Sequence, residues 1–185
     1  MRTINAAGVP VRTGAVQLES GENVFNASVI DDINGFAYFG TDTSPGIIVK
    51  IRLSDFTRVG SLTLNSGEGS LVRAFLDSFN GFAYFVTWTS PSKIIKIRLS
   101  DFTRVGALTL NSGENTLISV ALDSTNGFAY FGTGTSPGIV VKVNLSDFTR
   151  VGALTLNSGE NNLRVAILDS TNGFAYFGTY TSPGI

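Results

Sequence analysis

The residues best suited to do chemistry in this sequence are those that differ between otherwise near-identical repeats. The hexapeptide Asn-Gly-Phe-Ala-Tyr-Phe occurs four times, at intervals of 46 residues, and the residue before each Thr-Ser-Pro varies as Asp42, Trp88, Gly134 and Tyr180. Trp and Tyr side chains combine an apolar ring with a polar edge, so they suit stacking on a sugar or anchoring a protein contact. These loop positions are therefore candidates for ligand binding.

A second variable position lies at the start of the strand that precedes each hexapeptide. The four copies there have Asn26-Ala27, Val72-Arg73, Ile118-Ser119 and Arg164-Val165. Two of these pairs introduce an arginine. We take Asp42, Trp88, Tyr180, Arg73 and Arg164 as the candidate ligand-binding residues. The alternative is that these positions have drifted between copies without selection.

The charged residues that recur in every copy are expected to have structural roles. An active site usually needs two acids in different environments, whereas Glu22, Glu68, Glu114 and Glu160 recur in the same context. Asp77 stands before an Asn-Gly turn and is interpreted as a turn cap rather than as part of a calcium loop. Lys50, Arg52, Asp55 and Arg58, with their repeats, are expected to form surface ion pairs that contribute little.

The composition excludes several classes of function. The chain has no cysteine and no histidine, which excludes disulfides, thiol nucleophiles, Cys/His zinc sites and His-based triads. We expect no cofactor, no metal site and no enzymatic activity. The net charge is −1 with no basic stripe, so nucleic acid is not expected as a partner. No apolar run approaches the ~20 residues that span a bilayer.

The repeating unit that positions these residues is predicted to consist of strands. In the second copy a first strand runs over 71–76, and an Asn-Gly turn at 80–81 leads to a second strand over 82–87. Asn and Gly tolerate the positive φ of a tight hairpin. The second strand is apolar on both sides, which predicts cover by other sheets on both faces. Third and fourth strands are expected at 47–53 and 58–64 of the first copy.

Four short antiparallel strands per repeat, with cover on two faces, are typical of a β-propeller blade. We therefore predict an all-β fold, a β-propeller of four near-identical 46-residue, four-stranded repeats with about 15 regular strands. In such a fold the variable positions converge on one face and on the mouth of the central channel. A β-solenoid is the competing repeat fold, and the Asn-Gly hairpin turns argue against it.

The repeats also resemble a known family. Ala-Tyr-Phe-Gly-Thr at 37–41, followed by Val-Lys-Ile-Arg-Leu-Ser-Asp-Phe-Thr-Arg-Val-Gly at 49–60, is similar to the YVTN-type β-propeller repeat. In that family a Tyr-Val-Thr-Asn strand precedes a Val-x-x-Ile-Asp-x-x-Thr segment, and here Phe-Gly-Thr and Leu-Ser-Asp-Phe-Thr replace parts of both. The resemblance implies a propeller, often in surface or secreted proteins. It implies no single activity and transfers no functional residue.

The two ends of the chain determine how a ring could close. Residues 1–185 are expected to form a single domain, in which 1–11 match the repeat weakly and the register is clear from 12 to 185. Met1 stands 46 residues before Ile47, so 1–11 occupy the register of a missing third strand. Three arrangements remain: a four-bladed ring closed by the termini, a fragment of a longer propeller, or two chains in a ring of about eight blades. Exposed strand edges predict a homo-oligomer.

The predicted function is a non-enzymatic binding or assembly module with a protein or glycan ligand, in an extracellular or cell-surface structure. One alternative is a carbohydrate-binding lectin with sites near Trp88 and Tyr180. A second is an enzyme that uses carboxylates at the channel mouth.

Overall fold

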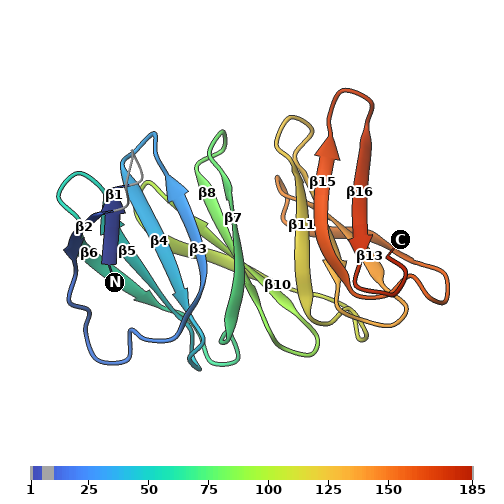
Figure 1. The fold of residues 1–185 in the computed structure, drawn as a ribbon, viewed down its shortest axis with the longest axis horizontal. Coiled ribbons are helices and arrows are strands. Elements are labelled where there is room, and N and C mark those ends of the chain that lie inside the picture. The colour runs from blue at the N-terminus through green and yellow to red at the C-terminus, as the bar shows by residue number, and fades with distance from the viewer. Residues whose placement is uncertain (1, 6–10, 185) are drawn as a thin grey trace.

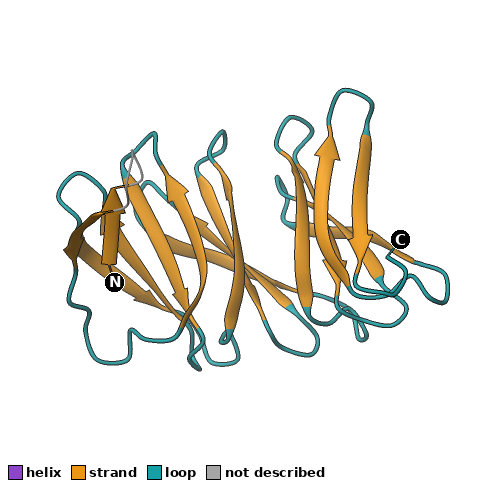
Figure 2. Ribbon diagram, in the orientation of Figure 1, coloured by secondary structure: helices purple, strands orange, loops and turns teal. Residues whose placement is uncertain are grey.

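The chain folds entirely into antiparallel strands. The structure, a computed structural model, describes residues 2–5 and 11–184. Sixteen strands and no helix occur in these two ranges (Figure 2). No described segment is a helix long and apolar enough to cross a membrane. The strands are β1 (Arg2–Asn5), β2 (Val11–Ala15), β3 (Phe25–Asp31), β4 (Phe36–Thr41), β5 (Ile47–Arg52), β6 (Thr57–Thr63), β7 (Leu71–Asp77), β8 (Phe82–Thr87), β9 (Lys93–Arg98), β10 (Thr103–Thr109), β11 (Leu117–Asp123), β12 (Phe128–Thr133), β13 (Ile139–Asn144), β14 (Thr149–Thr155), β15 (Leu163–Asp169) and β16 (Phe174–Thr179).

Each blade starts with the predicted hairpin. Gly35 has a φ of 75°, which glycine adopts without steric cost. The carboxylate of Asp31 accepts hydrogen bonds from the Asn34 backbone N–H at 3.2 Å and from Asn34 Nδ2 at 2.8 Å. The same two bonds recur in the other three copies. The interpretation of this Asp as a turn cap is confirmed.

The strands form three complete blades and two half-blades. The complete blades are β3-β4-β5-β6, β7-β8-β9-β10 and β11-β12-β13-β14, and the half-blades are β1-β2 and β15-β16. Figure 1 shows them side by side along the molecule, with the N-terminal half-blade at one end and the C-terminal half-blade at the other. β1 and β16 belong to different sheets, so the described strands of one chain do not close a ring.

β1 takes the place of the missing third strand beside β2. It pairs with β2 so that Arg2 stands opposite Ala15, while in the first complete blade Val49 stands opposite Ser61. Ala15 and Ser61 are one repeat apart, so Arg2 corresponds to Val49 and the spacing is 47 residues rather than 46. The predicted register was therefore wrong by one residue. The extra residue falls within 6–10, which lie outside the described residues.

The hydrophobic core lies between blades. Tyr84 and Phe85 are neighbours in β8 and point to opposite faces, and both are 0% exposed. Phe85 packs in a cluster with residues of the first complete blade, such as Tyr38 and Ile48. Tyr84 packs in a separate cluster with residues of the third, such as Phe131. The prediction that the second strand is covered on both faces is confirmed, and it follows that each blade is stabilised by both neighbours.

The lysines of the third strand do not form surface ion pairs, contrary to the prediction. The Nζ atom of Lys50 lies 3.9 Å from the centroid of the Phe36 ring. Lys96 is buried, and its Nζ donates a 2.8 Å hydrogen bond to the carbonyl of Leu145 in the next blade. Because both faces of the third strand are covered, the apolar stem of lysine packs there and its charge binds ring faces and a carbonyl. The prediction holds for Arg52, whose 3.1 Å pair with Asp55 is exposed.

A buried ion pair joins the loop before each complete blade to the fourth strand of that blade, and the prediction of surface pairs also missed it. Glu68 lies in the loop between β6 and β7, and its carbonyl accepts a 2.8 Å bond from Gly46 N–H of the preceding blade. Its carboxylate accepts two bonds from the guanidinium of Arg104 in β10, of which the one from Nε is 2.7 Å. Glu22 with Arg58 and Glu114 with Arg150 repeat this arrangement.

We expect Arg104→Ala to lower the free energy of unfolding by about 3 kcal/mol, because it leaves the buried carboxylate of Glu68 without its partner. The matched control is Arg98→Ala in the same blade, whose ion pair with Asp101 is exposed. Its loss should cost about 0.5 kcal/mol. Urea unfolding of the two variants measures the difference, and equal losses would contradict the structural role of the buried pair.

Candidate functional site

The two variable regions of the sequence lie on one face of the molecule. The loop after β4 and the loop before β7 are joined by hydrogen bonds from Ser70 N–H to Thr43 O at 3.0 Å and from Gly46 N–H to Glu68 O at 2.8 Å. The second of these bonds recurs from Ser92 N–H to Glu114 O at 3.2 Å, and both recur between the third complete blade and the last half-blade. We call the side of the molecule that carries these loops (42–46, 64–70 and their repeats) the loop face. Asp42, Trp88 and Tyr180 belong to these loops.

A constant backbone frame presents the variable side chains. The N–H of Asp42 donates to Val24 O at 2.7 Å, that of Trp88 to Ser70 O at 2.8 Å, and that of Tyr180 to Asn162 O at 2.9 Å. The three acceptors have φ angles of 51–52°, although none is glycine. Left-handed backbone costs roughly 1–2 kcal/mol for such residues. The same frame is kept in each blade while the side chain it presents changes.

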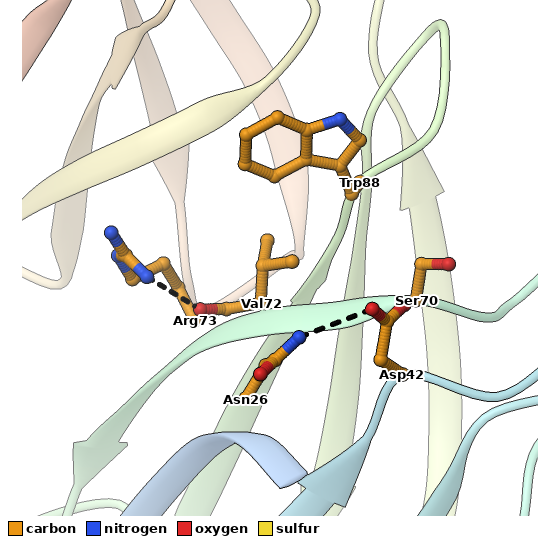
Figure 3. A pocket seen from close by; sticks show the side chains of 6 residues that line it. All are labelled: Asn26, Asp42, Ser70, Val72, Arg73 and Trp88. Carbon is orange, nitrogen blue, oxygen red and sulfur yellow. Dashed lines mark hydrogen bonds between the residues drawn. The ribbon is translucent and has the colours of Figure 1, made fainter. Parts of the chain in front are cut away.

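Three of the five candidate residues line one hollow. Asp42, Arg73 and Trp88, together with Asn26, Ser70 and Val72, surround a cavity of about 500 Å³ between the first two complete blades. We call this cavity the Trp88 hollow. Figure 3 shows the Trp88 indole on one side of it and Asn26 and Asp42 on the other. The Nδ2 of Asn26 donates a 3.1 Å hydrogen bond to Asp42 Oδ2. A volume of this size is within the usual range for small-molecule sites.

Arg73 extends from the Trp88 hollow toward the third complete blade. Its Nε donates to the carbonyl of Ile118 at 3.0 Å and one terminal nitrogen donates to Val72 O at 2.8 Å. Within residues 11–184 no carboxylate forms an ion pair with it. At the corresponding position Ser119 instead bonds the Leu163 carbonyl at 2.6 Å. Arg73 therefore bridges two blades and places a positive charge at the edge of the hollow.

The other two candidates lie together in the last half-blade. The guanidinium carbon of Arg164 is 5.0 Å from the centroid of the Tyr180 ring, a cation–π contact. The five residues thus form two groups rather than one. Asn26 and Val72 belong to the variable pairs but were not selected as candidates. Ser70 was missed, although its position also varies between copies, as Val24, Ser70, Thr116 and Asn162.

Three of the four recurring glutamates, Glu22, Glu68 and Glu114, are bound in ion pairs with arginines. Hydrogen bonds from Arg58 lower the pKa of Glu22 to about 2, although burial opposes this. Burial raises the pKa of Glu68, but the bonds from Arg104 and from the Asn65 backbone outweigh it, so the net change is also a lowering. Both carboxylates stay ionised and paired at neutral pH. The predicted structural role of these residues is confirmed.

The residues around the Trp88 hollow offer hydrogen bonding and aromatic stacking. Asp42 is the only carboxylate among its lining residues, and it already accepts a bond from Asn26. No group of three or more acidic residues in the described ranges is placed to hold a metal ion. An amide, a carboxylate and an indole around one cavity can bind a ligand that has hydroxyl groups on one side and C–H groups on the other.

Comparison with known structures establishes the fold. The chain matches the RRP9 WD40 repeats with a TM-score of 0.66 and 8% identity, covering 88% of this chain and 53% of that one. It matches the structure of U3-55K with a TM-score of 0.64 and 10% identity, covering 81% of this chain and 44% of that one. It matches Kuenenia stuttgartiensis hydrazine synthase with a TM-score of 0.71 and 12% identity, covering 91% of this chain and 47% of that one. The fold is thus a β-propeller repeat, and the chain spans about half the length of these proteins.

Comparison at the level of sequence adds no family. No protein-family model matches the chain, and no curated protein matches it. The resemblance to the YVTN-type repeat is supported as far as the propeller fold, and the specific family is not confirmed.

The lowered pKa of Glu22 predicts a pH-dependent stability. Its ordinary value is 4.5 and its value in the fold is about 2, so the ion pair with Arg58 stabilises fully above about pH 4.5. This contribution of roughly 3 kcal/mol is lost as the pH falls toward 2. We expect the difference in unfolding free energy between the parent chain and Arg58→Met to shrink by that amount between pH 6 and pH 2, as measured by urea unfolding. A difference that stays constant over this range would contradict the ion pair.

Proposed function

We propose that this chain is a non-enzymatic binding and assembly module that associates with another copy of itself through its incomplete blades. The observation that carries this proposal is the pair of half-blades at opposite ends of the molecule. β15 and β16 are the first two strands of a blade, and β1 and β2 have the place of the last two. Exposed strand edges of this kind bind further strands.

The arrangement of acidic groups supports the non-enzymatic part of the proposal. Glu22, Glu68 and Glu114, the recurring carboxylates near the loop face, are bound to arginines. The Trp88 hollow has a single carboxylate among its lining residues. General acid–base chemistry on carboxylates normally uses two of them with different pKa values. The alternative of an enzyme at the channel mouth has no such pair to support it.

The first measurement is the absolute mass of the chain in solution, by sedimentation or light scattering over a concentration series. We expect a species of twice the 19.6 kDa chain mass that dissociates on dilution, because each copy supplies the strands the other lacks. A mass near 19.6 kDa at all concentrations would contradict assembly. A series of larger, open-ended species would favour a polymer over a closed pair.

A glycan ligand at the Trp88 hollow is a second candidate function, supported by the cavity itself. Sugar rings have apolar C–H faces that stack on indole, and hydroxyl groups that bond carboxylates and amides. Trp88 is 53% exposed, so its ring has free area, and Asp42 with Asn26 supplies the polar side. The Arg164–Tyr180 pair is a smaller aromatic site of the same kind in the last half-blade.

Trp88 is the only tryptophan, so its fluorescence reports on this hollow alone. We expect titration with saccharides selected on a glycan array to change its emission, and Asp42→Ala to weaken binding about tenfold, because a hydrogen bond to a charged group is worth about 1.5–3 kcal/mol. Tyr180→Ala, which lies outside the hollow, is the matched control and should leave the titration unchanged. The absence of any glycan signal on the array would exclude this candidate.

A further inference from the structure

We infer that the partner in assembly is a second copy arranged head to tail, so that β15–β16 of one copy and β1–β2 of the other form one four-stranded blade, joined by an ion pair between Glu160 and Arg12. This inference rests on the proposed self-association and specifies its interface. It is carried by the repeated ion pairs, by the pairing of β1 with β2, by the exposed face of the last half-blade and by the positions of the two half-blades at opposite ends of the molecule.

The first argument is that Glu160 and Arg12 are the two unmatched members of a repeated pair. In each complete blade the arginine follows its glutamate by 36 residues. Arg12 stands one repeat before Arg58, and Glu160 stands one repeat after Glu114. Neither forms an ion pair within residues 11–184. If β1–β2 of a second copy completes the blade that β15–β16 begins, Arg12 of that copy lies beside Glu160, in the position that the arginine has beside each of the other glutamates.

The carboxylate of Glu160 is already oriented for such a partner. Its Oε2 accepts a 2.7 Å bond from the backbone N–H of Asn157. The paired glutamates are held by the same bond, at 3.1 Å from Asn65 to Glu68 and 2.9 Å from Asn111 to Glu114. The loop that holds the carboxylate therefore has its paired conformation in the absence of the arginine.

The N-terminal half-blade has the local geometry of a complete blade around its arginine. The pairing of β1 with β2 shifts register between Thr3 and Ile4, opposite Arg12. The pairing of β5 with β6 shifts between Lys50 and Ile51, opposite Arg58. The other two complete blades have the same bulge beside their arginines. The backbone at Arg12 therefore has the same geometry as the backbone that positions the paired arginines.

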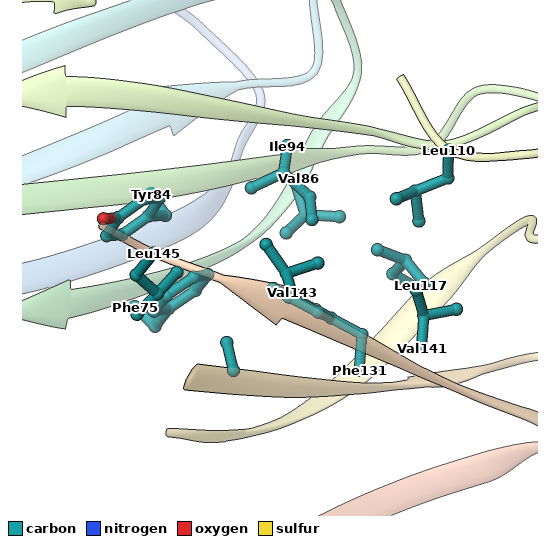
Figure 4. Packing of buried hydrophobic residues seen from close by; sticks show 11 residues of the cluster. Phe75, Tyr84, Val86, Ile94, Leu110, Leu117, Phe131, Val141, Val143 and Leu145 are labelled. Carbon is teal, nitrogen blue, oxygen red and sulfur yellow. The ribbon is translucent and has the colours of Figure 1, made fainter. Parts of the chain in front are cut away.

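The last half-blade exposes an apolar face whose counterpart is buried between the complete blades. Between the second and third complete blades, Phe75 and Tyr84 pack among Val143, Leu145 and Phe131 (Figure 4). The Phe75 and Phe131 rings are 5.5 Å apart, and the Tyr84 ring lies 5.9 Å from that of Phe148. At this interface Phe75 is 7% and Tyr84 0% exposed.

The corresponding residues of the last half-blade have no cover. Ile167 and Tyr176, which stand two repeats after Phe75 and Tyr84, are 68% and 56% exposed. If the repeat continues from one copy to the next, Phe39 of the second copy packs on Ile167 and its Phe56 packs on Tyr176. Phe39 is only half-buried, while its counterpart Phe85 is completely buried. The two ends therefore carry apolar surfaces that match the partners in a blade interface.

The positions of the two half-blades favour a second copy over the chain's own opposite end. β1 and β16 belong to different sheets, and in Figure 1 the two half-blades lie at opposite ends of the molecule. A second copy at each end would bring a C-terminal half-blade beside an N-terminal one.

The test uses charge reversal at the two ends of the full chain. We expect Arg12→Glu and Glu160→Arg each to raise the dimer dissociation constant at least a hundredfold in sedimentation equilibrium, because like charges then meet at both joints. An equimolar mixture of the two variants should restore the dimer, since each joint then has one acid and one arginine. The matched control Arg52→Glu, at an exposed ion pair, should leave the dissociation constant within about threefold of the parent.

The outcomes separate the inference from the function on which it rests. A parent chain that is monomeric overturns both the proposed self-association and the inferred interface. A dimer that either single variant leaves intact overturns this interface while self-association stands. Variants that weaken the dimer but are not rescued by mixing overturn pairing between copies.

A second measurement is independent of the charges and of any loss of folding in those variants. If β16 and β1 pair as β4 and β5 do, Ala175 of one copy stands opposite Ile4 of the next. The chain has no cysteine. A mixture of Ala175→Cys and Ile4→Cys chains should therefore form a covalent heterodimer under mild oxidation, and Ala175→Cys with Thr13→Cys should not. Equal yields in the two mixtures would overturn the inferred register.

Discussion

The constraint on which this structure depends is that each blade has two apolar faces. The second strand of every repeat carries aromatic side chains on both sides, so a single blade cannot bury its own core. Tyr84 and Phe85 are buried only because a blade packs on each side of β8. Stability is therefore shared between neighbours, as in other repeat architectures, and a blade without a neighbour exposes core residues to water.

Ion pairs fix how neighbouring blades meet. The Glu–Arg pairs join the loop between two blades to the outer strand of the second one, and backbone bonds join the same loop to the first. This arrangement holds the loop face in a constant frame. Side chains can then vary at the positions of Asp42, Trp88 and Tyr180 without a change in the backbone that presents them. A rigid frame with variable side chains is a general basis for binding sites.

The same constraint connects architecture with assembly. The half-blades at the two ends leave apolar faces, strand edges and one member each of the repeated ion pair without partners. A propeller that is incomplete in one chain can be completed by strands from another, because the groups that join successive blades are identical in every repeat. The proposed binding at the Trp88 hollow and the proposed assembly at the ends would use different surfaces, so one protein could combine both.

The strands, the hairpin turns and the propeller class could be predicted from the sequence. These follow from a fixed repeat and from local patterns of apolar, Asn and Gly residues, which act over short distances. Which residues meet follows from the tertiary structure alone. Lys96 bonds a carbonyl of the next blade, Arg104 pairs with the buried carboxylate of Glu68, and Asp42, Arg73 and Trp88 are separated from Arg164 and Tyr180. The reason is that contacts across a blade interface join residues far apart in sequence, and local periodicity gives no information about their partners.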